Sequence, residues 1–249
     1  MTVAADVSPD RMLWARRELL LRRSTSHLHV FAPQVTRDAQ GRPMEFTLLH
    51  LAWAAHLNYC WSRNLHAGIF GLGGGAGFTV TLAAWLLGRD REFRVKVVCS
   101  SEAQARLRVK AARGIASTRA YQRIFPNSLA GVTWSERMAS EERDGQVVDP
   151  RLEAHGLASR SLGPGATHLL FDDVPDAASS SVVRRRQEQK RLVQDMWLSR
   201  LLPGGKVLWV ARPQNPDDAS YALRQREDFC WLEQRRVGDG VEQEVYGAG

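Results

Sequence analysis

Residues 66–88 read HAGIFGLGGGAGFTVTLAAWLLG. A short apolar run ends in five glycines between Gly71 and Gly77, and the apolar residues that follow stop at Gly88. This pattern predicts a buried strand, a glycine loop and a helix. Backbone N–H groups at the start of such a helix can converge on an anion, and a phosphate is the natural ligand. The alternative is that the glycines only permit a tight turn and that Phe78 is a core residue of the helix.

The glycine loop departs from the motif Gly-x-x-x-x-Gly-Lys-Ser/Thr of phosphate-binding loops. When the motif is anchored on Gly77, Thr79 takes the hydroxyl position, Leu72 the first glycine and Phe78 the lysine. In the motif the lysine reaches the terminal phosphates and the hydroxyl binds magnesium. A phenyl ring cannot neutralise charge on those phosphates, so Phe78 counts against phosphoryl transfer.

The segments around the loop alternate between strands and helices. Val95 to Cys99 is a second buried strand, and Ser101 with Gln104 forms a capping box for an amphipathic helix through about Ile115. This order implies a parallel sheet with right-handed crossovers. Amphipathic helices are also expected in residues 10–23 and 45–64, and a hairpin at 144–145.

Two acids follow a later apolar strand. His168 to Phe171 is followed by Asp172 and Asp173, in the form of a Walker B element. In that element the first carboxylate holds the magnesium shell and the second orients or deprotonates the attacking water. The alternative is a helix N-cap or a solvated turn. A helix in 182–202, a turn at 203–205 and a strand in 206–211 are expected next.

Composition limits the classes of function. The net charge of +7 and the pI near 9.8 favour polyanionic partners. The basic run at 184–186 and 190–191 is most simply a solvated helix face, with DNA contact as the alternative. No apolar run approaches the roughly 20 residues that cross a bilayer. Cys60, Cys99 and Cys230 are far apart in sequence and form no Cys-x-x-Cys pair, so we expect reduced, buried thiols.

Several further pieces occur in a specific order and spacing. They are VVCSSEAQA at 97–105, IFP at 124–126, LEAHGL at 152–157, GPGATHLLFDD at 163–173, LPGGKVLWVAR at 202–212 and NPDD at 215–218. Together with the loop and the helix before it, they make the stretch from Phe46 to Leu223 resemble the ATPase domain of phage terminase large subunits. The resemblance implies a three-layer α/β P-loop NTPase fold of the RecA/ASCE-like type, with a mostly parallel sheet.

The resemblance also implies roles for single residues. ATP would bind at the Walker A position, and Thr79 and Asp172 would hold Mg²⁺. Asp173 would be the catalytic carboxylate, and Arg212 would belong to the coupling motif that senses the γ-phosphate. Asp172 is expected on a strand adjacent to the loop strand. The ATP-binding residues are Gly73, Gly74, Gly75, Ala76, Gly77, Phe78 and Thr79.

Three departures from the family affect the same function. Phe78 replaces the loop lysine, Ala211 replaces the coupling hydroxyl, and Gly74 stands where terminases often carry an additional arginine. We therefore keep two interpretations. In the first, the chain is the ATPase subunit of a viral DNA-packaging motor, and it takes a cation from Lys96 or from a neighbouring subunit. In the second, it is a catalytically inactive interaction module or the remnant of a split terminase gene.

The expected organisation is an N-terminal helical arm or lid in 1–44, the ATPase domain in 45–223 and a C-terminal stub in 224–249, too short for the family's nuclease domain. The partners implied are double-stranded DNA, a portal or procapsid, a small terminase subunit and further copies of the chain in a ring. No membrane is implied, and the expected location is the bacterial host cytoplasm.

Overall fold

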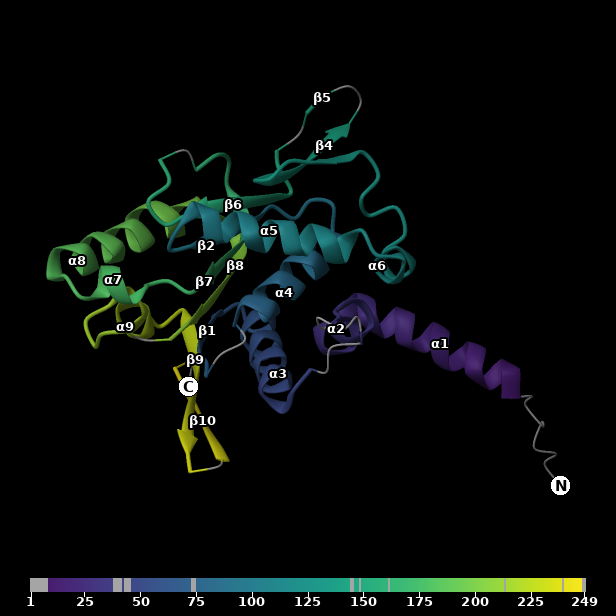
Figure 1. Ribbon diagram of the computed structural model, residues 1–249, viewed down its shortest axis with the longest axis horizontal. Coiled ribbons are helices and arrows are strands. Elements are labelled where there is room, and N and C mark those ends of the chain that lie inside the picture. Colours follow the sequence, from purple (N-terminus) through teal and green to yellow (C-terminus); the bar gives the residue numbers. More distant parts are fainter. Residues whose placement is uncertain are drawn as a thin grey trace.

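A mostly parallel sheet runs through the middle of the computed structural model, with helices on both of its faces (Figure 1). The structure describes residues 9–37, 42, 46–72, 75–143, 146–147, 149–160, 162–212, 214–238 and 240–247. Among these, no helix combines the length and the apolar character that crossing a membrane requires.

The sheet has the strand order β10-β9-β1-β8-β7-β2-β6-β4-β3, with β5 beside β4. The strands from β9 to β6 in this order pair in parallel, whereas β10, β4, β3 and β5 pair antiparallel with their neighbours. The parallel strands are β1 (His66–Phe70), β2 (Val95–Cys99), β6 (Leu152–Gly156), β7 (Ala166–Asp172), β8 (Leu201–Ala211) and β9 (Phe229–Val237). The antiparallel strands are β3 (Val132–Trp134), β4 (Met138–Arg143), β5 (Gln146–Val147) and β10 (Gly240–Tyr246).

Successive strand residues enter two separate cores, because side chains alternate across a sheet. Ile69, Leu170 and Leu208 belong to one core, and their neighbours Phe70, Phe171 and Trp209 belong to the other. The first core lies under helices α2 (Leu28–Val35), α3 (Leu48–Ser62), α4 (Gly75–Arg89), α5 (Glu102–Ala116) and α6 (Arg119–Ile124). The second lies under a π-helical turn (Leu192–Trp197) and α9 (Ala219–Arg224). The result is a three-layer α/β arrangement.

The strands and helices next to the glycine loop confirm the predicted alternation. Strand β2 has the predicted bounds, and Ser101 caps α5 by accepting a hydrogen bond from the backbone N–H of Gln104. Helix α4 begins at Gly75, within the expected loop. Strands β4 and β5 pair antiparallel on either side of positions 144–145, which lie outside the described residues.

Three elements differ from the expectation. The helix expected in 182–202 is divided into α8 (Val183–Arg191), the π-helical turn and a 3-10 turn (Leu198–Arg200), and a short helix, α7 (Ala177–Ser180), precedes it. Strand β8 already begins at Leu201 and includes the expected turn. Residues expected to form a C-terminal stub provide β9 and β10, and the first five residues of β9 pair with β1.

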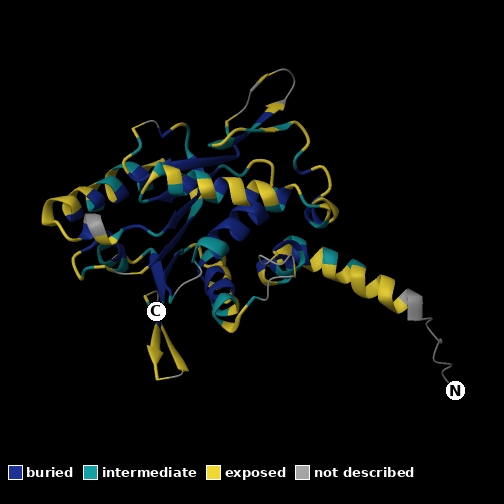
Figure 2. Ribbon diagram, viewed as in Figure 1, coloured by how far each residue is buried: buried dark blue, intermediate teal, exposed yellow. Residues whose placement is uncertain are grey.

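Helix α1 (Pro9–Ser26) extends from one end of the molecule and is mostly exposed (Figures 1 and 2). Its exposed side chains include Met12, Leu13 and Trp14. Helix α2, in contrast, buries Leu28, Phe31, Ala32 and Val35 in the first core. The N-terminal arm is therefore anchored through its second helix.

Candidate functional site

A pocket of about 180 Å³ lies where β1, β7 and β8 end and α4 begins. The carboxyl edge of a parallel sheet is where ligands bind in open α/β folds. The pocket brings together residues from the glycine loop, the Asp-Asp pair and the Ala211-Arg212 pair, which are far apart in sequence. Its lining residues are Trp53, Gly71, Gly75, Ala76, Arg108, Asp172, Asp173, Val210, Ala211 and Arg212.

Gly75 allows a close approach between the start of α4 and the acids. A Cβ atom at this position would lie 2.8 Å from Cγ1 of Val210 and 3.3 Å from Oδ1 of Asp172. Any larger residue would therefore displace the side chain of Val210 or the carboxylate of Asp172. Gly73 and Gly74, two of the predicted ATP-binding residues, lie outside the described residues. Ala76 lines the pocket, and Gly77 belongs to the first turn of α4.

Phe78 points into the first core and does not line the pocket. It is 0% exposed, and its ring packs against Phe46 and Trp53 at centroid distances of 6.1 and 5.4 Å. This is the environment of a core residue, as in the alternative interpretation of the loop. The ring position therefore supplies neither charge nor a hydrogen bond to the pocket.

The hydroxyl of Thr79 is buried and has no hydrogen-bond partner among the described residues. Buried hydroxyls are nearly always paired, so this one needs an explanation. Mg²⁺ prefers oxygen ligands, and Thr79 and Asp172 both offer them. The donor chemistry therefore fits a magnesium ion. Thr79 does not line the pocket itself.

Asp172 is held by an arginine that we did not predict. Nε of Arg108, from α5, donates to Oδ2 of Asp172 at 2.6 Å, and the two side chains are 21% and 3% exposed. Burial raises the pKa of Asp172, and the bond from Arg108 opposes this shift. A sequence signal existed, because Arg108 falls between Ala105 and Ala112 in the buried stripe of α5.

Asp173 occupies a strained backbone position beside the pocket. Its φ of 59° lies in the left-handed region, and its N–H donates to the carbonyl of Val210 at 3.0 Å. Such conformations are uncommon outside glycine and gather at functional sites. Arg212 is exposed at the pocket rim, whereas Ala211 is buried. The strand of Asp172 is also not adjacent to β1 as expected, since β8 lies between them.

Lys96, a candidate for the missing cation, makes its contacts outside the pocket. It is buried on β2, where it pairs with Glu153 and donates to the carbonyl of Leu162 at 2.7 Å. It does not line the pocket. The cations at the pocket are therefore Arg108 and Arg212, within the described part of the chain.

A larger cavity, of about 650 Å³, lies over α2, α3 and α4. Its lining is mostly apolar, with His27, His29 and Arg89 as basic residues and no acid within the described part of the chain. Acids and arginines do not meet there as they do at the smaller pocket. We therefore place the candidate site at the carboxyl edge of the sheet.

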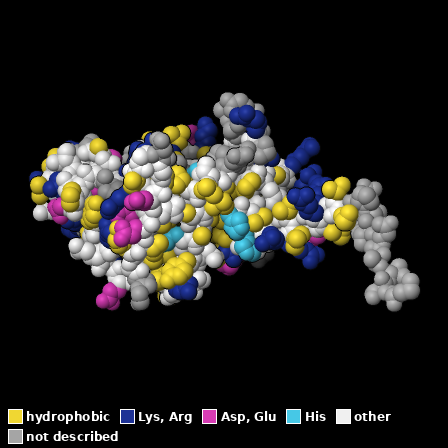
Figure 3. Space-filling view, turned by 90° about the horizontal axis from the view of Figure 1, so that it is seen from below, with side chains coloured by type: hydrophobic (Ala, Val, Ile, Leu, Met, Phe, Trp, Pro, Cys, Tyr) yellow, Lys and Arg dark blue, Asp and Glu magenta, His cyan; other side chains and the backbone are white. Residues whose placement is uncertain are grey.

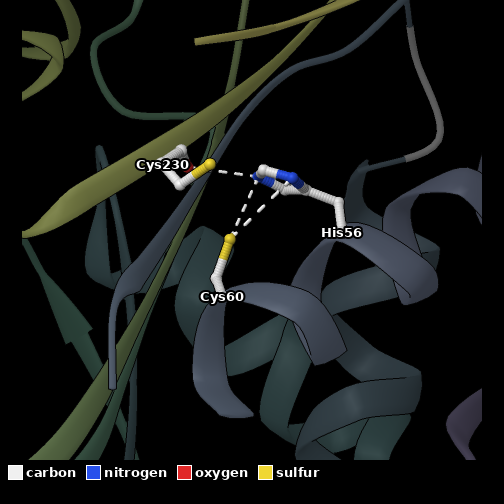
Figure 4. A group of neighbouring side chains, drawn as sticks. All are labelled: His56, Cys60 and Cys230. Carbon is white, nitrogen blue, oxygen red and sulfur yellow. Dashed lines mark hydrogen bonds between the residues drawn. The ribbon is translucent and has the colours of Figure 1, made fainter. Parts of the chain in front are cut away.

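His56, Cys60 and Cys230 form a buried cluster whose possible metal-ligand atoms lie within 4.8 Å of one another (Figure 4). Nε2 of His56 lies 3.1 Å from the carbonyl oxygens of both Gly68 and Cys230, so this nitrogen carries the proton and donates. Burial raises the pKa of both thiols. We interpret the cluster as a hydrogen-bonded contact that joins α3 to β1 and β9. The sequence did not indicate this cluster, because Cys60 and Cys230 are far apart in the chain.

The chain matches no protein-family model and no curated protein. The interpretation of the pocket therefore depends on its geometry, in which a glycine at a helix N-terminus, two acids and two arginines converge.

Proposed function

We propose that this chain is a terminase-like P-loop domain from a viral DNA-packaging motor, which binds ATP and couples its hydrolysis to DNA translocation into a procapsid. The observation that carries the proposal is the pocket, where Gly75, Asp172, Asp173 and Arg212 meet although three separate segments provide them. These are the groups that a phosphate-binding loop, a Walker B element and a coupling motif would supply.

The strand order supports the same proposal. Strand β8 lies between β1, which leads into the glycine loop, and β7, which ends in the acids. The pocket is lined by residues from the ends of all three strands or directly after them, so this order brings the loop and the acids to one site.

Each group at the pocket would have its own role in ATP binding and hydrolysis. Backbone N–H groups at the start of α4 would bind the phosphates, because a helix N-terminus attracts anions. Thr79 and Asp172 would hold a magnesium ion, which neutralises phosphate charge when it is bound. Asp173 would orient the attacking water and accept its proton, and Arg212 would contact the γ-phosphate. The partners would be double-stranded DNA, a portal or procapsid, a small terminase subunit and other copies in a ring, in the cytoplasm of a bacterial host.

Specific observations favour a second candidate, an inactive interaction module of the same fold. Phe78 is buried in the core, and Arg108 occupies one oxygen of Asp172. The pocket volume of about 180 Å³ also lies below the roughly 300 Å³ at which typical ligand pockets begin. In this candidate the fold and the basic surface serve assembly, and the chain does not hydrolyse ATP.

Turnover of ATP by the wild type and by Asp173→Asn separates the two candidates. Asparagine tolerates the left-handed backbone at this position but cannot accept the proton of the water. For a working motor domain we expect the variant to lose roughly 100-fold or more in turnover, while ATP affinity changes little.

The matched control is Asp195→Asn, which removes an exposed acid on the π-helical turn and should leave turnover unchanged. ATP binding by the wild type without turnover above buffer would support the inactive module. No binding of ATP by the wild type would exclude the nucleotide site in both candidates.

A further inference from the structure

We propose that Arg108 is the phosphate-binding cation of the pocket and takes the role of the lysine that Phe78 replaces. The inference rests on the proposed nucleotide site, and it names the side chain and the ligand group that meet there. The ligand is the terminal phosphate of a nucleoside triphosphate. Arg108 reaches this position from α5 and not from the glycine loop.

The contact with Asp172 orients the guanidinium group. Nε donates to Oδ2 of Asp172 at 2.6 Å, and the carboxylate is almost fully buried, so one edge of the guanidinium is fixed. Among the described residues, Nε is the guanidinium nitrogen of Arg108 that is hydrogen bonded. The two terminal NH₂ groups therefore keep their donors for a ligand. An arginine held in this way can bind phosphate with two parallel hydrogen bonds.

The other side of the pocket is suited to the same phosphate. Gly75 and Ala76 place the N-terminus of α4 in the same lining as Arg108. Oδ1 of Asp172 faces this helix start, since it lies 3.3 Å from the position of a Cβ on Gly75. One oxygen of Asp172 thus orients Arg108, and the other faces the start of α4.

Other cations are less suitable for this role. Lys96 is buried against Glu153, and Arg212 is exposed at the rim. Arg108 alone among these three residues combines partial burial, a fixed orientation and a place in the pocket lining. Partial burial matters because a charge-assisted hydrogen bond is stronger where water is largely excluded.

The same ion pair has an opposite interpretation, in which Arg108 closes the site by neutralising Asp172. The two interpretations predict opposite changes in the affinity for ATP when Arg108 is removed. If Arg108 binds phosphate, its removal weakens the binding of ATP. If Arg108 closes the site, its removal frees Asp172 for magnesium and strengthens the binding of Mg²⁺-ATP.

Isothermal titration calorimetry of the full chain with ATP, ADP and AMP, each with Mg²⁺, tests the proposal. For Arg108→Ala we expect roughly 10- to 100-fold weaker binding of ATP, from the loss of one or two charge-assisted hydrogen bonds. The loss should be smaller for ADP and smallest for AMP, because the contact is to the terminal phosphate. A general loss of structure would weaken all three nucleotides alike.

Arg106→Ala is the matched control. Arg106 lies on the same helix two positions earlier, and its guanidinium pairs with Glu102 and Glu136 away from the pocket. Its loss should leave the three affinities unchanged. Arg108→Lys keeps the positive charge without the planar guanidinium group, and we expect its loss of ATP affinity to lie between those of the wild type and Arg108→Ala. This variant also tests the proposal if Arg108→Ala does not fold.

The outcomes separate this inference from the proposed function. Wild-type binding of ATP with unchanged or tighter binding by Arg108→Ala would overturn the role of Arg108 and leave the nucleotide site standing. An equal loss for ATP, ADP and AMP would overturn it as well. If the wild type binds no nucleotide, the proposed function fails and this inference fails with it.

Discussion

At the scale of a single residue, His168 makes the stability of the fold depend on pH. It is buried on β7, between the rings of Phe93 and Trp61, at centroid distances of 4.5 and 5.2 Å. Burial, together with the charges of Arg89 and Lys206, lowers the pKa of His168 to about 3. The folded protein therefore keeps a neutral ring at pH 5, whereas the unfolded chain protonates it below about 6.5. This contribution to stability is complete above pH 6.5 and is lost as the pH falls toward 3.

We expect His168→Gln to reduce the pH dependence of unfolding. Between pH 7 and pH 5, His168 should account for about 2 kcal/mol of the decrease in unfolding free energy of the wild type. Urea unfolding of both proteins at the two pH values measures this. At pH 7, the difference in unfolding free energy between the two proteins reports the packing lost with the ring. The change in this difference between pH 7 and pH 5 reports the effect of protonating His168. An identical pH dependence in both proteins would contradict the assignment.

The candidate site could be predicted in part from single residues. Gly75, Ala76, Asp172, Asp173 and Arg212 line one pocket, and the sequence pointed to all five. Arg108 was missed because a basic residue in an amphipathic helix usually belongs to its solvated face. The alternatives for Phe78 could not be separated from sequence, since the same position can face a loop or a core. Its direction depends on where α4 begins.

At the scale of an element, Arg151 holds the C-terminal end of α4. It is fully buried, and its guanidinium donates to the carbonyls of Leu87 and Asp90 at 2.5 and 2.9 Å and lies beside Glu141. The last carbonyls of a helix, such as that of Leu87, lack intrahelical partners, and a cation there also complements the helix dipole. We expect Arg151→Met to lower the free energy of unfolding by about 3–5 kcal/mol, because the buried carboxylate of Glu141 and the buried carbonyls lose a charged partner.

Arg91→Met is the control for this element. Arg91 pairs with the other oxygen of Glu141, but its side chain is 47% exposed. Its loss should cost about 1 kcal/mol or less. Chemical denaturation of both variants gives the comparison. The proposed anchor is wrong if the two substitutions destabilise the protein equally.

Elements next to the glycine loop were predictable because local pattern determines them. Periodicity marked β2 and α5, and a capping residue marked the start of α5. The position of β8 between β1 and β7 could not be predicted, since strand order depends on contacts between distant segments. The division of 182–202 into several helical pieces was also missed. Pairing with β7 draws Leu201 into β8, and this ends the helix earlier than its apolar pattern indicates.

At the scale of the whole molecule, basic side chains gather at the end that carries α1 (Figure 3). Arg16, Arg17, Arg22 and Arg23 are exposed there, and Arg22 pairs with Glu18. On α8, at the other end of the molecule, Arg186 and Lys190 already pair with Asp217. We therefore expect α1 to provide most of the DNA contact. Binding should be weak, independent of sequence and strongly dependent on salt, since phosphates provide the contacts.

Fluorescence anisotropy with two unrelated duplexes across a range of salt concentrations tests this expectation. Substituting Arg16 and Arg17 together by alanine should weaken binding and reduce the slope of log affinity against log salt by about 2. Substituting the exposed Arg184 and Arg185 of α8 is the control, with a smaller expected effect. A preference for one duplex, or affinity indifferent to salt, would exclude phosphate contacts as the basis of binding.

Strand β1 is held between β8 and β9, and both of these neighbours come from the last quarter of the chain. During synthesis, β1 therefore leaves the ribosome long before either partner exists. Pairings of such long range are slow to form, because a long loop has to close first. The pocket also needs Val210 and Arg212, so it cannot assemble before β8 has emerged. A nascent chain would acquire its candidate ligand site as one of its last folding events, and until then the edges of β1 would be open to other chains.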